Sequence, residues 1–166
     1  GGVFRRDADG DYWLVDQVAD FLHTRQGVLP SLPIEEAVWE LPAVSAAAAY
    51  GLRLEGLRSE VPAVTVLLRD GATLDLDGLA RVVAEKLQPA LRPLLVRVAT
   101  DLPLTAGYRV LKGPLRTRGI APADLAEGRV FAWDAERERY VALDAAAWDA
   151  MLDTWRRCEA DVVARR

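Results

Sequence analysis

Two apolar runs, Val44–Leu52 and Val61–Leu68, restrict the fold of this chain more than any other feature of its sequence. Each run is far shorter than the roughly 20 apolar residues that a membrane-spanning helix needs. Their apolar character is partly continuous instead of strictly alternating, which is typical of strands in a sheet covered on at least one face. We therefore expect two neighbouring strands of a buried sheet.

The segments around these runs carry signals for a hairpin, helices and further strands. Asp and Gly at positions 7–11 favour a turn between two short strands. Pro33 followed by acidic residues marks the start of one helix, and Asp75 or Asp77 can cap a second. The predicted elements, in chain order, are strands at 3–6 and 12–15, a polar irregular stretch at 16–30, a helix at 33–41, the two apolar strands, a helix at about 75–87, a strand at 94–98, a loop at 101–115, a short helix at 122–126, a strand pair at 130–133 and 138–143, and a helix from 144.

This order predicts an α+β fold: a small hairpin followed by a mostly antiparallel three-stranded sheet flanked by helices, with an extra C-terminal helix. We place one domain at residues 1–143 and a helical extension at 144–166. The apolar residues of that extension fall on one helical stripe, which favours a core or docking face over a membrane or cofactor feature. They are Trp148, Met151, Leu152, Trp155 and Val162.

Composition limits the chemistry that this chain can perform. The 21 basic and 25 acidic residues give a net charge of −4, which argues against a nucleic-acid partner. A single cysteine, Cys158, excludes an internal disulfide, and a single histidine, His23, excludes a metal site built from histidines. The chain contains no phosphate-binding loop, no nucleophile elbow and no transmembrane run. We expect a cytoplasmic protein, and its start at Gly1 inside an apparent strand predicts a piece of something longer.

Most individual candidates for catalysis have a simpler structural explanation. His23 lies in a polar stretch, Cys158 has no histidine nearby in sequence to activate it, and acidic residues at 35–36 suit a helix N-terminus. The segment 101–112 is different, because a Gly-containing turn there carries Arg109 and Lys112 three residues apart. Such a turn can bring positive charge to a phosphate or an adenylate, although a solvated loop is the default reading.

The segment GVFRRDADGDYWLVD at residues 2–16 resembles the opening of the C-terminal domain of adenylate-forming enzymes. Within that superfamily it is most similar to the fatty-acid transport protein and very-long-chain acyl-CoA synthetase branch. The resemblance covers nearly the whole chain up to about Met151. It continues through Ile34–Val38, Leu91–Arg97, Leu102–Thr105, Val130–Trp133 and Tyr140–Leu143.

In this family a large N-terminal domain binds ATP and the acid, and the small C-terminal domain swings between an adenylating and a thioester-forming pose. The resemblance implies that the parent protein activates a carboxylic acid with ATP and Mg²⁺ and passes it to CoA or a carrier thiol. It implies an N-terminal adenylation domain as partner, in the same chain or in a separate subunit, and a small-molecule acyl substrate. The domain alone would bind none of these cofactors and would be inactive by itself.

The resemblance also places the site residues. The catalytic lysine of the family falls on Arg109, a second basic residue falls on Lys112, and the hinge falls on Ala19. The thiol-channel loop of the family falls on Arg25, Gln26 and Gly27.

Three positions of the nucleotide site depart from the family pattern. Gln17 stands where the family has a ribose-binding arginine, Gly1-Gly2 replaces a Thr-Gly-Asp motif, and Arg109 replaces the lysine. Arginine keeps the charge but differs from lysine in shape and reach. These departures predict degenerate nucleotide binding. The alternative function is therefore a non-adenylating homologue that acts as a scaffold or docking domain, or in a different acyl-transfer reaction.

Overall fold

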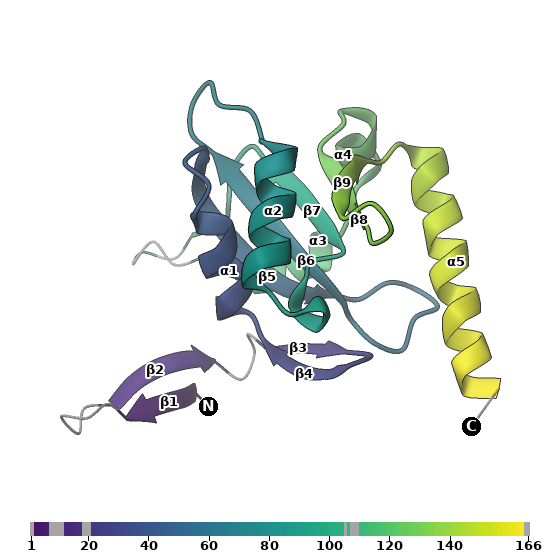
Figure 1. Ribbon diagram of the computed structural model, residues 1–166, viewed down its shortest axis with the longest axis horizontal. Helices are drawn as coiled ribbons and strands as arrows, with labels where there is room; N and C mark the ends of the chain where they lie inside the picture. The colour runs from purple at the N-terminus through teal and green to yellow at the C-terminus, as the bar shows by residue number, and fades with distance from the viewer. Residues whose placement is uncertain (1, 7–11, 18–20, 105, 107–109, 165–166) are drawn as a thin grey trace.

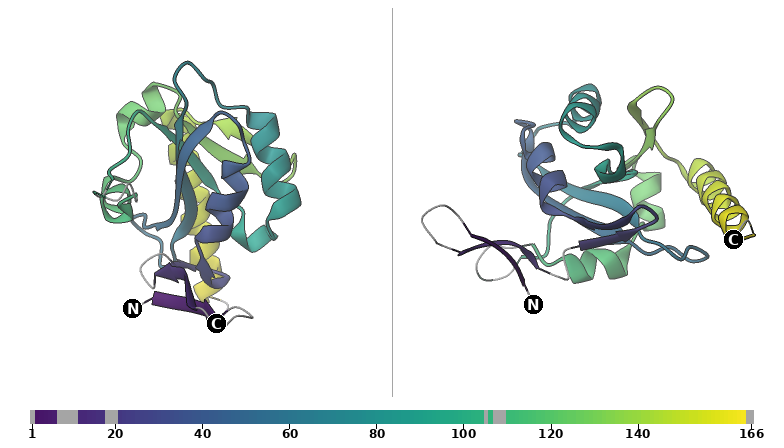
Figure 2. Two further views of the ribbon diagram at one scale, coloured as in Figure 1. Left: turned by 90° about the vertical axis from the view of Figure 1, so that its left-hand side faces the viewer. Right: turned by 60° about the horizontal axis from the view of Figure 1, so that its bottom comes forward.

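The computed structural model describes residues 2–6, 12–17, 21–104, 106 and 110–164, and its centre is a five-stranded sheet with helices on both faces (Figure 1, Figure 2). Two separate hairpins precede the sheet. The elements are β1 (Gly2–Arg6), β2 (Tyr12–Gln17), β3 (Phe21–Thr24), β4 (Gly27–Pro30), α1 (Leu32–Trp39), β5 (Val44–Leu52), β6 (Val61–Leu68), α2 (Leu76–Lys86), the 3₁₀ turn η2 (Pro89–Leu91), β7 (Leu95–Ala99), α3 (Lys112–Arg118), α4 (Pro122–Ala126), β8 (Val130–Asp134), β9 (Arg139–Ala142) and α5 (Ala145–Ala164).

The strand order of the sheet is β5-β6-β7-β8-β9, and every neighbouring pair except β6 and β7 is antiparallel. The mixed α and β class and the mostly antiparallel sheet are therefore confirmed. The prediction of three strands was wrong, because the strand pair predicted at 130–143 adds to the same sheet. Leu95 of β7 faces Ala132 of β8, which makes β8 and β9 its last two strands.

The central strands send alternate side chains into two cores, one on each face of the sheet. One core lies under α1 and α2, and the other contacts α3, α4 and α5 (Figure 2). Because both faces are covered, the two apolar runs have no solvent face and read as nearly continuous in sequence. The first core takes Ala47, Ala49, Val64, Val66 and Val96 from the sheet, and the second takes Ala48, Tyr50, Ala63, Leu95 and Val130.

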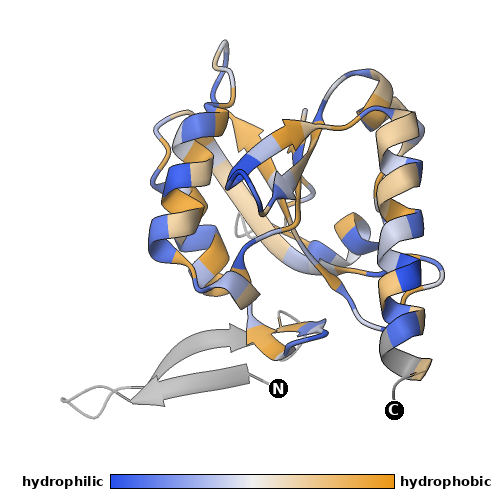
Figure 3. Ribbon diagram, turned by 45° about the vertical axis from the view of Figure 1, so that its right-hand side comes forward, coloured by the Kyte–Doolittle hydropathy of each residue, from blue (hydrophilic) through white to orange (hydrophobic). Residues whose placement is uncertain are grey.

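The helices follow the signals in their sequences. Asp75 caps α2 by accepting a hydrogen bond from Gly78 N at 3.0 Å, and Leu79 and Val83 on its inner face are fully buried. Hydrophobic and hydrophilic residues alternate along α2 and α5, as one-sided burial requires (Figure 3). Within the described residues, no helix has both the length and the apolar character of a membrane span.

Two segments predicted as irregular contain regular structure. Within the predicted irregular stretch 16–30, residues 21–30 form the hairpin β3–β4, in which Phe21 faces Pro30 and Leu22 is fully buried. The predicted loop 101–115 ends at Lys112, where α3 begins. The sequence did not indicate this helix, because a proline such as Pro114 usually breaks a helix. Pro114 lies in the first turn of α3, where backbone N–H groups have no intrahelical acceptor.

Candidate functional site

The loop predicted to carry positive charge has a closed base. Leu104 and Val110 form an antiparallel bridge, and Leu111 N donates a hydrogen bond to Pro103 O at 2.8 Å. Helix α3 starts immediately afterwards. Arg109, the residue predicted to be catalytic, lies outside the described residues, as does the predicted hinge Ala19. The structure thus fixes where the loop leaves and rejoins the domain.

Lys112 holds this base against the body of the domain. Its Nζ lies 2.7 Å from Glu35 Oε1 and donates to Ser31 Oγ at 2.8 Å. The same Glu35 oxygen accepts a hydrogen bond from Ala49 N at 3.0 Å, on edge strand β5. The side chain of Lys112 is only 10% exposed, so its charge is largely committed to contacts within the domain. A role of Lys112 in nucleotide binding stays a prediction.

The predicted thiol-channel loop is the tight turn between β3 and β4. Thr24 Oγ1 donates to Gly27 O at 3.1 Å and accepts from Gln26 N at 3.2 Å. Gly27 has φ +119°, a backbone conformation that favours glycine. The side chains of Arg25 and Gln26 are exposed. The residue types at this turn therefore suit a short, rigid loop that presents two polar side chains.

A pocket of about 420 Å³ lies beside this turn. Arg25 and Gln26 line it from the hairpin, Arg92 from the segment before β7, and Trp155 and Glu159 from α5. Helix α5 is held there because the carboxylate of Glu159 accepts hydrogen bonds from the backbone of the connection between β5 and β6; the donors are Arg58 N at 2.9 Å and Ser59 N at 3.3 Å.

Gln17 and Gly2, two positions that are predicted to depart from the family's nucleotide-binding pattern, are partners across the β1–β2 ladder. The hairpin thus brings them together although they are far apart in sequence. The predicted site residues do not all gather in one place, however. Lys112 contacts Ser31 after the last residue of β4, and the turn at 25–27 lies at the opposite end of that hairpin.

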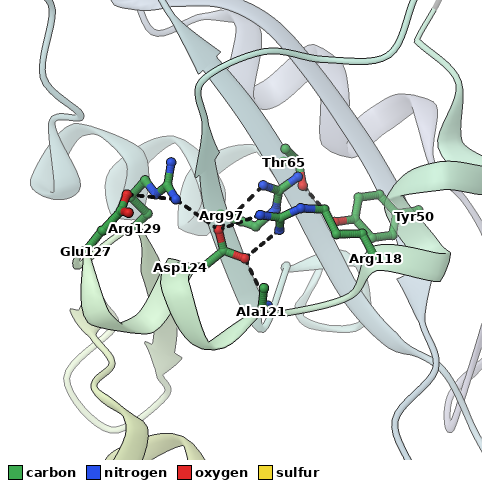
Figure 4. A network of polar contacts seen from close by, with 8 residues as sticks. All are labelled: Tyr50, Thr65, Arg97, Arg118, Ala121, Asp124, Glu127 and Arg129. Atoms are coloured by element: carbon green, nitrogen blue, oxygen red, sulfur yellow. Dashed lines mark hydrogen bonds and ion pairs between the residues drawn. The ribbon is translucent and has the colours of Figure 1, made fainter.

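A charged cluster around Asp124 was not predicted (Figure 4). Asp124 is fully buried, and both of its oxygens receive hydrogen bonds from Arg118, at 2.5 and 3.0 Å. Its Oδ2 also accepts from Ala121 N at 3.0 Å, while Arg129 lies 3.4 Å and Arg97 3.9 Å from Oδ1. One signal in the sequence could have indicated this cluster: Arg97 is a charged residue inside the apolar strand β7. In the structure Arg97 is only 5% exposed.

Opposing effects act on the pKa of Asp124. Burial favours the neutral acid and would raise the pKa, but the hydrogen bonds from Arg118 and Ala121 N and the charges of Arg118 and Arg97 outweigh it. The pKa therefore lies below its ordinary value, and Asp124 is ionised at neutral pH. In return, its hydrogen bond with Asp124 raises the pKa of Arg118.

Two large apolar side chains at the loop base are exposed: Leu104 is 46% and Leu111 43% exposed. A third, Val28, is 59% exposed but lies beside the turn of the β3–β4 hairpin, where it faces His23. Exposed apolar side chains that lie beside one another, as Leu104 and Leu111 do, are typical of a surface that contacts another protein or domain.

No metal site emerges from the part of the chain that the structure describes. Within it, no group of three or more His, Cys, Asp or Glu side chains could hold a metal ion. Cys158 is an exposed free cysteine on α5.

Comparison with known proteins agrees with this architecture. Residues 33–107 match the family model described as the AMP-binding enzyme C-terminal domain. The chain is 35% identical over 116 residues to an acetyl-coenzyme A synthetase from Deinococcus radiodurans, which covers 70% of this chain and 18% of the relative. It is 22% identical over 156 residues to a very long-chain fatty acid transport protein from Cochliobolus heterostrophus, covering 92% of this chain and 24% of that protein.

Among solved structures, the chain is similar to the amide bond synthetase McbA from Marinactinospora thermotolerans. The TM-score is 0.62 and the identity 28%, over 72% of this chain and 24% of that one. This chain therefore spans only about a fifth to a quarter of the length of the proteins that it matches. The family match and the shared fold lead to one conclusion: residues 33–107 form a C-terminal domain of the AMP-binding enzyme family, which includes the acyl-CoA synthetases.

Proposed function

We propose that this chain is the mobile C-terminal part of an enzyme that activates a carboxylic acid with ATP and transfers it to a thiol, CoA or a carrier. The observation that carries this proposal is the family match, which runs from Pro33 into the loop between Leu104 and Val110. That loop contains Arg109. The closed base and the anchor at Lys112 hold both ends of the loop on the domain, which supports a loop that moves with the domain.

In this proposal Arg109 supplies positive charge where negative charge develops on the acid and the α-phosphate during adenylation. ATP and Mg²⁺ would be held chiefly by a larger N-terminal domain, in the same chain or in a separate subunit. The exposed apolar residues Leu104 and Leu111 support a docking surface for that domain at the loop base. The turn Arg25–Gly27 would line the path of the thiol in the second pose, and the adjacent pocket supports that assignment.

The test is acid-dependent exchange between ATP and pyrophosphate by the complete enzyme, measured with a panel of carboxylic acids. Arg109→Ala is expected to lower the exchange rate by about 10²–10³-fold, as loss of one preorganised charge donor does in other enzymes. Arg81→Ala, on the exposed side of α2, serves as the matched loss of an arginine and should leave the rate unchanged. Equal rates for Arg109→Ala and the unmodified enzyme would contradict the role of this loop.

A second function is favoured by the nucleotide site. By the resemblance to the family, Gly2 and Gln17 stand at two ribose-contacting positions, and they lie opposite each other on one hairpin. Lys112, the second candidate cation beside Arg109, is bound to Glu35 and Ser31. Both observations support a homologue in which adenylation is weakened or lost, and in which the domain persists for docking or for a different acyl-transfer reaction.

Restoring the family residues separates the two functions. If adenylation was lost locally, the complete protein shows no exchange and the triple variant Gly2→Asp, Gln17→Arg, Arg109→Lys gains it. The control carries Gly2→Asn, Gln17→Leu and Arg109→Met, which change the same positions without the required charges. Robust ATP–pyrophosphate exchange by the unmodified protein rules out the second function. If neither the unmodified protein nor the triple variant shows exchange, the loss of adenylation does not lie at these three positions.

A further inference from the structure

A second pocket, of about 170 Å³, adjoins the Asp124 cluster on the face of the sheet opposite α1 and α2. Three arginines line it: Arg97 from β7, Arg118 from α3 and Arg129 from the residue before β8. Asp101 also lines the pocket and is exposed. Three guanidinium groups from three separate segments thus converge on one small hollow.

The positive charge around this pocket exceeds the buried negative charge. Asp124 is the one buried carboxylate in the cluster and neutralises one guanidinium. Glu127 lies 2.8 Å from Arg129 Nη2, but its side chain is 59% exposed, and water screens exposed charges of this kind. Two of the three guanidinium groups are therefore left without a buried counter-charge among the described residues, and one of these two, Arg129, has only the exposed Glu127 there as a further partner.

Arg97 bears most of this imbalance. Its side chain is 6% exposed, and its closest approach to Asp124, 3.9 Å, is too long for a hydrogen bond. Its Nε is buried without a hydrogen-bond partner within the described residues, and the same holds for Arg129 Nε. A buried charge that lacks compensation is unfavourable, and an anion beside it removes the penalty.

We propose that this pocket binds a phosphate group. Guanidinium forks match the geometry of phosphate oxygens and hold them by charge-assisted hydrogen bonds. The volume is well below the roughly 300–1,000 Å³ of pockets for drug-sized ligands, so it suits a single phosphate instead of a whole nucleotide. Because Asp101 and Pro103 precede the loop that starts at Leu104, a bound phosphate would join β7, α3 and the residue before β8 next to the start of that loop. This inference does not depend on the proposed ligase activity.

The experiment titrates inorganic phosphate into the full chain at constant ionic strength, with chloride as the balancing anion, and follows heat by calorimetry. Saturable binding with a Kd on the order of 1 mM is expected. Arg97→Met should weaken it at least tenfold. Because Arg97 is buried and that variant could fail to fold, Arg129→Gln, at a side chain that is 21% exposed, provides a second variant with the same expected loss.

Arg156→Gln is the matched control. Arg156 is also partly buried, but its guanidinium donates to Glu55 O, and it lines neither this pocket nor the larger one. Its phosphate affinity should equal that of the unmodified chain. The proposal is overturned if phosphate binding does not saturate, if Arg97→Met and Arg129→Gln both keep full affinity, or if acetate binds as tightly as phosphate.

Discussion

Replacing Asp124 with asparagine is expected to lower the free energy of unfolding by about 3–5 kcal/mol, the range seen when one partner of a buried ion pair is removed. Asn keeps the size of the side chain but removes the charge that Arg118, Arg97 and Arg129 surround. The arginines then remain in place with no buried carboxylate. For a chain of this length the melting temperature should fall by about 6–20 °C.

Chemical denaturation of both proteins measures this difference. Glu40→Gln is the control, because it also removes a paired carboxylate, but one that lies 3.7 Å from Lys86 and is about half exposed. Exposed pairs of this kind contribute about 0–1 kcal/mol. A loss below about 1 kcal/mol for Asp124→Asn, equal to that of the control, would mean that the cluster does not hold β7, α3 and α4 together.

The pH dependence gives an independent check on the same carboxylate. The pKa of Asp124 is lower in the folded chain than in the unfolded one, so its contribution to stability is complete above the unfolded value of about 3.9. As the pH falls from there through the folded pKa, that contribution is lost. The difference in unfolding free energy between the two proteins should therefore shrink below about pH 4, while other carboxylates affect both proteins alike.

The sequence predicts the individual helices and strands of this fold better than it predicts which strands pair with one another. Val44–Leu52 and Val61–Leu68 could be recognised as strands because burial on both faces removes polar alternation. Their neighbours could not be deduced, because periodicity reports which face a residue takes and not which strand lies beside it. The pairing of Leu95 with Ala132, which extends the sheet to five strands, is therefore visible only in the structure.

The same limit applies to the candidate site. Resemblance to the family was sufficient to select the loop that contains Arg109. It could not show that Lys112 reaches Ser31, 81 positions away, or that one Glu35 oxygen binds both Lys112 and Ala49 N. These contacts depend on how α3 lies against α1 and β5. Arg97 is the exception, since a charged residue inside an apolar strand already indicates a buried partner.

The sequence predicts that the domain ends at residue 143 and that residues 144–166 are an extension. A substitution at Trp148, in this extension, tests that boundary. The Trp148 side chain is 9% exposed and belongs to the second core, the same hydrophobic cluster that contains Leu125 and Leu143. Met151, Leu152 and Trp155 continue the contact along α5. If α5 completes the core, Trp148→Ala should lower the free energy of unfolding by about 3–5 kcal/mol, as large-to-small changes of buried aromatic residues do.

Asp149→Ala is the control, since it changes the next, exposed residue of the same helix and should alter stability by less than about 0.5 kcal/mol. Hydrogen exchange then distinguishes two ways in which the helix could matter. If α5 is part of the core, Trp148→Ala also destabilises β7 and β8, and the amides of these strands exchange faster together with those of α5. If only α5 exchanges faster and the sheet is unchanged, residues 144–166 are an appendage and the domain ends at 143. We expect the first result, because Trp148 packs into the core that the sheet itself builds.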